Sequence, residues 1–155
     1  MIGNDELIRL LNSVKLFIYD FDGVLTDNRV LVSEDGKESA FVNRSDGLGV
    51  KMISQLNIEQ MILSTEKNPI VRQRAKKLQL PVIHGVDSKE NELKPILKKY
   101  NINQSQVAYI GNDINDLEIM KIIALPLCPN DAYPAIKDVS KYIFNSIGGH
   151  GVIRE

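Results

Sequence analysis

The sequence is poor in the residues that mark several classes of protein. It contains one cysteine, two histidines and no tryptophan among 155 residues. A lone cysteine, Cys128, excludes an internal disulfide and a cysteine-based zinc site, and we expect it to be a small buried apolar residue. The chain has 19 Lys and Arg against 20 Asp and Glu. It therefore lacks the excess of basic residues that is typical of proteins that bind nucleic acids or anionic membranes. We therefore expect neither nucleic acid nor membrane as a partner.

Long hydrophobic runs are also missing. Apolar stretches such as residues 122–125 are far shorter than a membrane span. The first residues lack the basic and then apolar pattern of a signal peptide. With 43% hydrophobic residues and a length near the commonest domain size, the chain can bury a sizeable core. These features predict one globular, cytoplasmic domain over residues 1–155.

Short apolar runs alternate with helical patterns along the chain. The first run, residues 16–19, has no polar alternation, which is typical of a strand buried on both faces. Further strands are predicted at 60–63, 82–83, 107–110, 125–127 and 142–144. Helices are predicted at 47–56, 69–78, 89–100, 115–123 and 133–139, and a short helix over 5–11 with Asn4 as its cap. This order predicts an α/β fold with a Rossmann-like, doubly wound parallel sheet.

Residues 30–42 interrupt the first strand-to-helix crossover. Their two apolar segments, 30–32 and 38–42, flank Asp35-Gly36, a pair that favours a β-hairpin turn. The glycine-rich segment 148–155 is expected to be flexible.

Two aspartates follow the first predicted strand directly. Asp20 and Asp22 are two residues apart, so in an extended segment both carboxylates face the same side. Close carboxylates raise each other's pKa unless a cation lies between them. An isolated Asp-x-Asp can also be a polar strand end, but Gly23 allows the sharp turn that a binding loop needs.

A second polar cluster, residues 111–116, follows the strand predicted at 107–110. Taken alone it could be a turn with a helix cap. Ligands of parallel sheets bind at the carboxyl ends of the strands, so two acidic loops on neighbouring strands would face each other. Their oxygens are the ligands that Mg²⁺ prefers, and we expect Mg²⁺ as cofactor. Tyr109, on the preceding strand, is expected only to pack in the core.

Two further features would complete a phosphate site. Ser64-Thr65 follows a predicted strand and can donate hydroxyl and main-chain N–H groups to a phosphoryl oxygen, and Lys89 opens a helix and can place an ammonium group nearby. Each of them alone is commonly solvated surface. Together with the two acidic loops they supply a nucleophile, an acid/base, anion donors and a metal site, the requirements of phosphoryl transfer.

In this order, the motifs resemble those of the haloacid dehalogenase superfamily of phosphatases. The residues that carry the resemblance are Asp20-x-Asp22-Gly23-Val24-Leu25-Thr26, Ser64, Lys89 and Gly111-Asn112-Asp113-x-x-Asp116. The match extends from about residue 15 to the end of the sequence. Within the superfamily the chain is similar to the small branch without a cap domain. That branch contains the phosphatases of 3-deoxy-manno-octulosonate (KDO) 8-phosphate and of nonulosonate 9-phosphates.

The resemblance implies a role for each motif residue. Asp20 would be the nucleophile that forms an aspartyl-phosphate, and Asp22 would protonate the leaving sugar oxygen and later activate water. Ser64 and Lys89 would hold the phosphoryl oxygens.

The resemblance also implies the ligands of Mg²⁺: the Asp20 carboxylate, the Asp22 main-chain carbonyl, and Asn112 or Asp113. Asn112 stands where the family usually has an aspartate, so the choice between Asn112 and Asp113 stays open. Asp116 would orient the loop or a metal-bound water.

The predicted substrate is a sugar acid phosphate, which carries a carboxylate besides its phosphate and needs an additional cation. The candidate substrate-binding residues are Asp46, Glu66, Arg74, Lys77 and Arg154. The basic helix at 69–78 could equally be a solvated face. Glu66, Arg74 and Lys77 match the residues of the nonulosonate branch, which favours a nine-carbon 9-phosphate, with KDO 8-phosphate as the alternative.

Without a cap domain the site would be open to water. In the resembling branch the hairpins associate and a neighbouring subunit covers each site. The resemblance therefore implies a homotetramer in which the tail ending Arg154-Glu155 folds over an active site. The alternatives are a phospho-accepting receiver domain, whose motif order differs, and a catalytically weak oligomerisation domain like those fused to acylneuraminate cytidylyltransferases. The presence of both Asp20 and Asp22 favours an active phosphatase.

Overall fold

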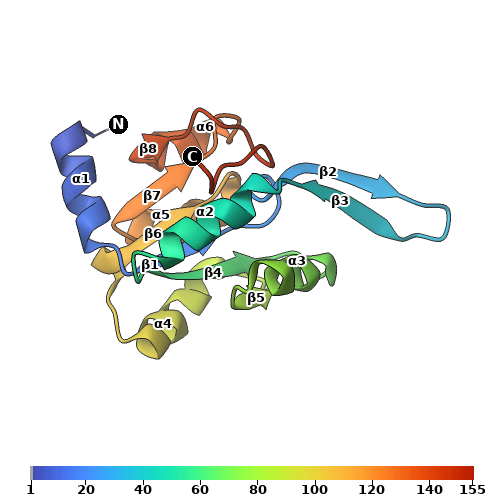
Figure 1. The fold of residues 1–155 in the computed structure, drawn as a ribbon, viewed down its shortest axis with the longest axis horizontal. Coiled ribbons are helices and arrows are strands. Elements are labelled where there is room, and N and C mark those ends of the chain that lie inside the picture. The colour runs from blue at the N-terminus through green and yellow to red at the C-terminus, as the bar shows by residue number, and fades with distance from the viewer. Residues whose placement is uncertain (1) are drawn as a thin grey trace.

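A six-stranded parallel sheet forms the centre of the molecule (Figure 1). The computed structural model describes residues 2–155, so Met1, the first residue of the predicted 1–155 domain, lies outside the described residues. The strand order is β5-β4-β1-β6-β7-β8. The strands are β1 (Leu16–Tyr19), β4 (Glu59–Ser64), β5 (Val82–His84), β6 (Val107–Ile110), β7 (Leu125–Cys128) and β8 (Tyr142–Ile143). The predicted doubly wound α/β sheet is confirmed, with β1 at the point where the strand order reverses.

Helices connect the strands in the predicted alternation. They are α1 (Asn4–Ser13), α2 (Ser45–Ser54), α3 (Ile70–Leu78), α4 (Lys89–Tyr100), α5 (Leu117–Ile122) and α6 (Pro134–Val139), with 3₁₀ turns at Gln104–Gln106 and Ile114–Asp116. The prediction of Asn4 as a cap is wrong: Gly3 is the N-cap, and its carbonyl accepts from the Leu7 amide, so Asn4 lies inside the first turn. In residues 2–155 no helix has the length and apolar character needed to cross a membrane.

Both faces of the sheet are buried. Tyr19 of β1 packs in one hydrophobic core, with Ile62 and Ile110. Ile18 of the same strand packs in the other core, with Met61 among its members. A strand covered on both faces gains from apolar residues at every position, which is why the run 16–19 does not alternate.

The strands β2 (Thr26–Val32) and β3 (Glu38–Val42) form an antiparallel hairpin that projects from the body of the molecule (Figure 1). Its turn is closed by a hydrogen bond of 2.9 Å from the Ser33 amide to the Lys37 carbonyl. Gly36 has a φ of 77°, as the predicted turn requires. The hairpin exposes five large apolar side chains: Val30, Leu31, Val32, Phe41 and Val42.

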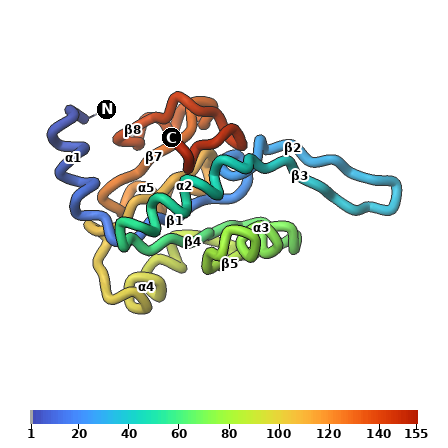
Figure 2. The backbone as a smooth tube through the Cα atoms, viewed as in Figure 1, coloured from blue at the N-terminus to red at the C-terminus, as the bar shows by residue number. Residues whose placement is uncertain are grey.

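The C-terminal segment, which the sequence predicts to be flexible, is packed against the body. Figure 2 shows it beside α2 and near the base of the hairpin. Val152 and Ile153 are buried, and the Ile153 amide donates to the Asp46 carboxylate at 3.1 Å. Gly49 of α2 permits this approach, because a side chain there would overlap the Ile153 carbonyl. The prediction was wrong because two apolar residues in the segment enter the core.

Candidate active site

The two polar loops predicted to face each other meet at the carboxyl edge of the sheet. β1 lies next to both β4 and β6, so the residues after all three strands share one edge. A cavity of about 280 Å³ at this edge is lined by Asp20, Asp22, Asn28, Ser64, Thr65, Asn112, Asp113 and Asn115. The structure therefore brings together the predicted acid pair, the predicted serine and both metal-ligand candidates of the second loop.

Lys89 is buried beneath this cavity and joins two carboxylates. Its Nζ lies 2.7 Å from Asp20 Oδ1 and 2.6 Å from Asp116 Oδ1. Burial raises the pKa of Asp20 well above its ordinary value and Asp116 raises it further, whereas Lys89 acts in the opposite direction. Burial alone would lower the pKa of Lys89, but the two carboxylates raise it by more. Lys89 is thus a charged partner of Asp20 and is not among the residues that line the cavity.

Asp116 organises the second loop through both of its oxygens. Oδ2 accepts from the Asn112 amide at 2.9 Å and from the Asp113 amide at 3.3 Å. Oδ1 accepts from the Tyr109 hydroxyl at 2.5 Å as well as from Lys89. Tyr109 packs in the core as predicted, but its hydroxyl also takes part in the site. Its place in an apolar run gave no sign of this contact.

The side chain of Asp22 is positioned by a hydrogen bond from the buried Thr26. The Thr26 hydroxyl donates to Asp22 Oδ1 at 3.3 Å and accepts from the Gly23 and Asn28 amides, each at 3.2 Å. Burial raises the pKa of the Asp22 carboxyl, and the charge of Glu66 raises it further. A carboxyl group with a raised pKa is suited to carry a proton to a leaving group.

The donors at this edge suit a hard divalent cation. Asn112 Oδ1 is buried and has no hydrogen-bond partner among the described residues. Gly23, with a φ of 74°, leaves room for the Asn112 side chain, which any side chain at position 23 would overlap. A buried acceptor without a donor beside two aspartates fits a cation. Within residues 2–155, no three His, Cys, Asp or Glu side chains lie close enough to hold a metal ion.

Four of the candidate substrate-binding residues lie outside the cavity, on or beside α2 and α3. Asp46 is buried in α2 under the C-terminal segment. Arg74 of α3 donates to the Asn43 carbonyl at 2.6 Å, and Glu66 accepts from a neighbouring main-chain amide. Lys77, also on α3, is exposed.

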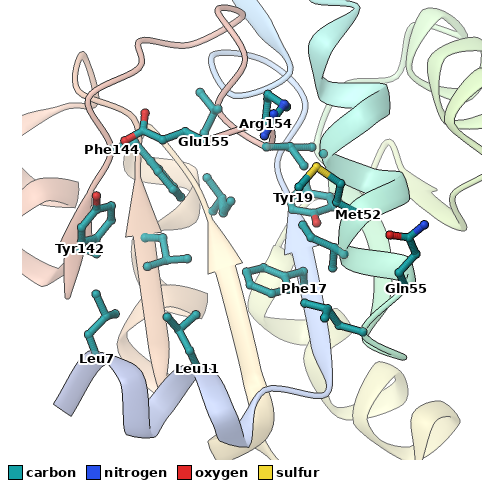
Figure 3. Close-up of a pocket in the computed structure, with 17 residues that line it drawn as sticks. Leu7, Leu11, Phe17, Tyr19, Met52, Gln55, Tyr142, Phe144, Arg154 and Glu155 are labelled. Atoms are coloured by element: carbon teal, nitrogen blue, oxygen red, sulfur yellow. The ribbon is translucent and has the colours of Figure 1, made fainter. Parts of the chain in front are cut away.

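Arg154 lines a second, apolar cavity. This cavity, of about 640 Å³, lies between α1, α2, the sheet and the C-terminal segment (Figure 3). Phe17, Tyr19 and Met52 are among its other lining residues. Within the single chain, Arg154 is therefore not brought to the cavity that contains Asp20.

Two lining residues, Asn28 and Asn115, were not predicted as site residues. Asn115 Nδ2 donates to Thr65 Oγ1 at 3.2 Å and so connects the loop after β6 to the loop after β4. Its position inside the motif 111–116 was an available signal. Asn28 lies just before the predicted hairpin of residues 30–42, inside the observed strand β2, and nothing in the local pattern marks it.

The model of the haloacid dehalogenase-like hydrolase family matches residues 51–155. The chain belongs to this family of hydrolases.

Particular relatives narrow the class to phosphatases. The 3-deoxy-D-manno-octulosonate 8-phosphate phosphatase KdsC of Salmonella typhi is 31% identical over 146 residues, covering 92% of this chain and 77% of that protein. N-acylneuraminate cytidylyltransferase A of Danio rerio is 30% identical over 146 residues, covering 92% of this chain but 34% of that protein. The structure of the KDO 8-phosphate phosphatase of Moraxella catarrhalis, in complex with magnesium ion, phosphate ion and KDO, matches with a TM-score of 0.93. Its sequence identity is 31%, over 98% of this chain and 88% of that chain. The chain is a haloacid dehalogenase-type phosphatase related to KdsC.

Proposed function

We propose that this protein hydrolyses the phosphate monoester of a keto sugar acid, with Asp20 as the nucleophile. The observation that carries the proposal is the position of Asp20 at the carboxyl end of β1. It shares a cavity with Asp22 and Ser64 and forms an ion pair with the buried Lys89. This arrangement supports the proposal, which needs a nucleophile, an acid/base and a hydroxyl donor around one point.

The reaction proceeds in two displacements. The Asp20 carboxylate attacks phosphorus, and the ester bond breaks as the leaving sugar oxygen takes a proton from Asp22. Asp22 then takes a proton from a water molecule whose oxygen attacks phosphorus, which releases phosphate and restores Asp20. Ser64 Oγ accepts from the Glu66 amide at 3.1 Å, so its own proton is free to donate to a phosphoryl oxygen. Lys89 holds Asp20 in place and contributes its positive charge to the site.

A divalent cation, Mg²⁺ in the first instance, fits the same edge. The Asp20 carboxylate, the Asp22 main-chain carbonyl and Asn112 or Asp113 would hold it, and Asp116 would orient their loop. When bound, the cation supplies positive charge against the transferring phosphoryl group. The unpartnered Asn112 oxygen supports this assignment, as does the magnesium ion in the related Moraxella structure.

KDO 8-phosphate is the first candidate substrate. The Salmonella relative is named for this activity, and the Moraxella neighbour contains KDO. The sequence alone favours the nine-carbon 9-phosphate over KDO 8-phosphate, so the relatives reverse the order of the two candidate substrates. A nonulosonate 9-phosphate remains the second candidate, supported by Glu66, Arg74 and Lys77 and by the relation to an N-acylneuraminate cytidylyltransferase.

We also propose that the protein is a homotetramer assembled through its hairpins. A two-stranded hairpin is marginally stable on its own, and exposed apolar strands favour association. A neighbouring subunit would cover the exposed hairpin side chains and close the open side of the cavity.

The function is tested by phosphate release from KDO 8-phosphate, a nonulosonate 9-phosphate and p-nitrophenyl phosphate, with and without Mg²⁺. We expect Asp20→Asn to lower kcat by roughly 10⁴-fold on every ester, because the amide is not a nucleophile. Asp138→Asn, an exposed aspartate on α6, is the matched control and should retain activity. The proposal would be contradicted if Asp20→Asn released phosphate at the wild-type rate. It would also be contradicted if the wild-type protein released no phosphate from any of the three esters.

A further inference from the structure

Asn28 has a backbone conformation that its place in the fold does not explain. Among residues 2–155, four non-glycine residues have positive φ: Asn28 at 63°, Asn57 at 55°, Gln79 at 58° and Asn101 at 53°. Gln79 and Asn101 are the C-caps of α3 and α4, and Asn57 lies in the turn after α2, positions where left-handed residues commonly end helices. Asn28 is instead inside the strand β2.

An irregularity in the hairpin turns Asn28 toward the active site. Thr26 pairs with Val42, and the next pair is Val30 with Ala40, so residues 27–29 of β2 stand opposite residue 41 alone. Bulges of this kind re-aim side chains and occur next to active sites. Asn28 accordingly lines the cavity that contains Asp20 and Asp22.

The side chain of Asn28 is available to a ligand. It is exposed and makes no hydrogen bond to another residue in the part of the chain that the structure describes. Its main-chain amide donates to the same Thr26 hydroxyl that contacts Asp22. Since Asp22 faces the leaving oxygen in the proposed reaction, Asn28 lies on the leaving-group side of the cavity.

We propose that Asn28 is a specificity-determining residue that hydrogen-bonds hydroxyl groups of the leaving sugar. The inference rests on the proposed phosphatase function and deepens it. A carboxamide has both donors and an acceptor, which matches the hydroxyl groups of a sugar, each itself a donor and an acceptor. Glycine would adopt the same φ without strain, so the asparagine side chain is present at a conformational cost.

The test compares Asn28→Gly with the wild-type protein on KDO 8-phosphate and p-nitrophenyl phosphate. Glycine suits the positive φ, so the variant removes the carboxamide without straining the hairpin. We expect the ratio of the two kcat/KM values, sugar ester to aryl ester, to fall about 3- to 10-fold, the effect of one lost hydrogen bond. The loss should be largely a rise in KM for the sugar ester. Asn101→Gly makes the same change at the positive-φ asparagine that caps the C-terminus of α4 and should leave the ratio unchanged.

A ratio that does not change would overturn the inference. If it stays unchanged because both esters lose activity equally, Asn28 acts only through the backbone. If the wild-type protein cleaves the aryl ester but not KDO 8-phosphate, the first proposed substrate is wrong. The same ratio is then measured with the hydroxylated ester that the wild-type protein cleaves fastest. If it cleaves no hydroxylated ester, both proposals fail.

Discussion

Asn112 puts a neutral amide oxygen where a carboxylate would add charge. Its Oδ1 is buried and unpartnered among the described residues, while its main-chain amide is tied to Asp116. The affinity of oxygen sites for divalent cations depends on the number of charged ligands. The identity of this one residue therefore bears directly on how tightly the proposed site binds Mg²⁺.

We predict that Asn112→Asp strengthens Mg²⁺ binding by roughly 10-fold, because it adds a charge beside Asp20 and Asp22. The same charge repels its neighbours when no cation is present, so thermal stability without Mg²⁺ should fall and should recover on Mg²⁺ addition. Isothermal titration calorimetry and thermal unfolding measure the two effects. The control variant Asn101→Asp, at the C-cap of α4, should change neither. If Asn112→Asp leaves binding unchanged while Asp113→Asn weakens it, Asp113 is the ligand.

At the scale of elements, the β2–β3 hairpin stands apart from the central sheet and exposes apolar side chains that another subunit would bury. Within residues 2–155 the strands of the hairpin pair only with each other, and they carry a group of exposed apolar side chains away from the sheet (Figure 1). The base of the hairpin also carries Thr26 and Asn28, which contact or flank Asp22. Packing of the hairpin against another subunit would thus stabilise one wall of the active site.

We predict that Phe41→Glu reduces the proposed tetramer to smaller species, because a charge in the proposed interface would lose its hydration. Sedimentation velocity gives the oligomeric state, and circular dichroism checks that the fold persists. Leu56→Glu is a matched control, since Phe41 and Leu56 are both 68% exposed and Leu56 lies outside the hairpin. A wild-type protein that sediments as a monomer, or a Phe41→Glu variant that assembles like it, would rule out hairpin-mediated assembly.

At the scale of the whole molecule, Asp46 ties α2 to the C-terminal segment. Its Oδ1 accepts the Ile153 amide, and its Oδ2 is buried without a partner among the described residues. Burial raises the pKa of Asp46 to about 6, although the Ile153 and Arg154 amides and the charge of Arg74 act in the opposite direction. The folded protein therefore holds a proton at Asp46 that the unfolded chain, with an ordinary carboxyl pKa, has already lost.

This difference in protonation determines whether stability rises or falls with pH. Between about pH 4 and pH 6 the folded state binds more protons at Asp46, so its contribution to stability falls as pH rises and the loss is complete above the folded pKa. Asp46→Asn removes the effect. We predict that, relative to wild type, the free energy of unfolding of Asp46→Asn rises by about 2 kcal/mol from pH 4 to pH 7. Urea unfolding at four pH values in this range measures it, and parallel curves for the two proteins would contradict it.

The local sequence pattern was sufficient to predict the sheet and the polar residues at its edge. A strand buried on both faces needs a run such as 16–19, and parallel strands bring their carboxyl ends together, so Asp20, Asp22, Ser64 and the loop 111–116 could be placed before any coordinates were known. The hairpin followed from its turn residues in the same way.

The features that the sequence did not predict depend on contacts between segments far apart along the chain. The burial of Lys89 between Asp20 and Asp116, and the hydroxyl contact of Tyr109, join residues from different strands and helices. The packed C-terminal segment, with Arg154 at a separate apolar cavity, depends on space that Gly49 leaves in α2. Such contacts follow from how the elements pack in three dimensions, and neither the spacing nor the polarity of neighbouring residues along the chain encodes them.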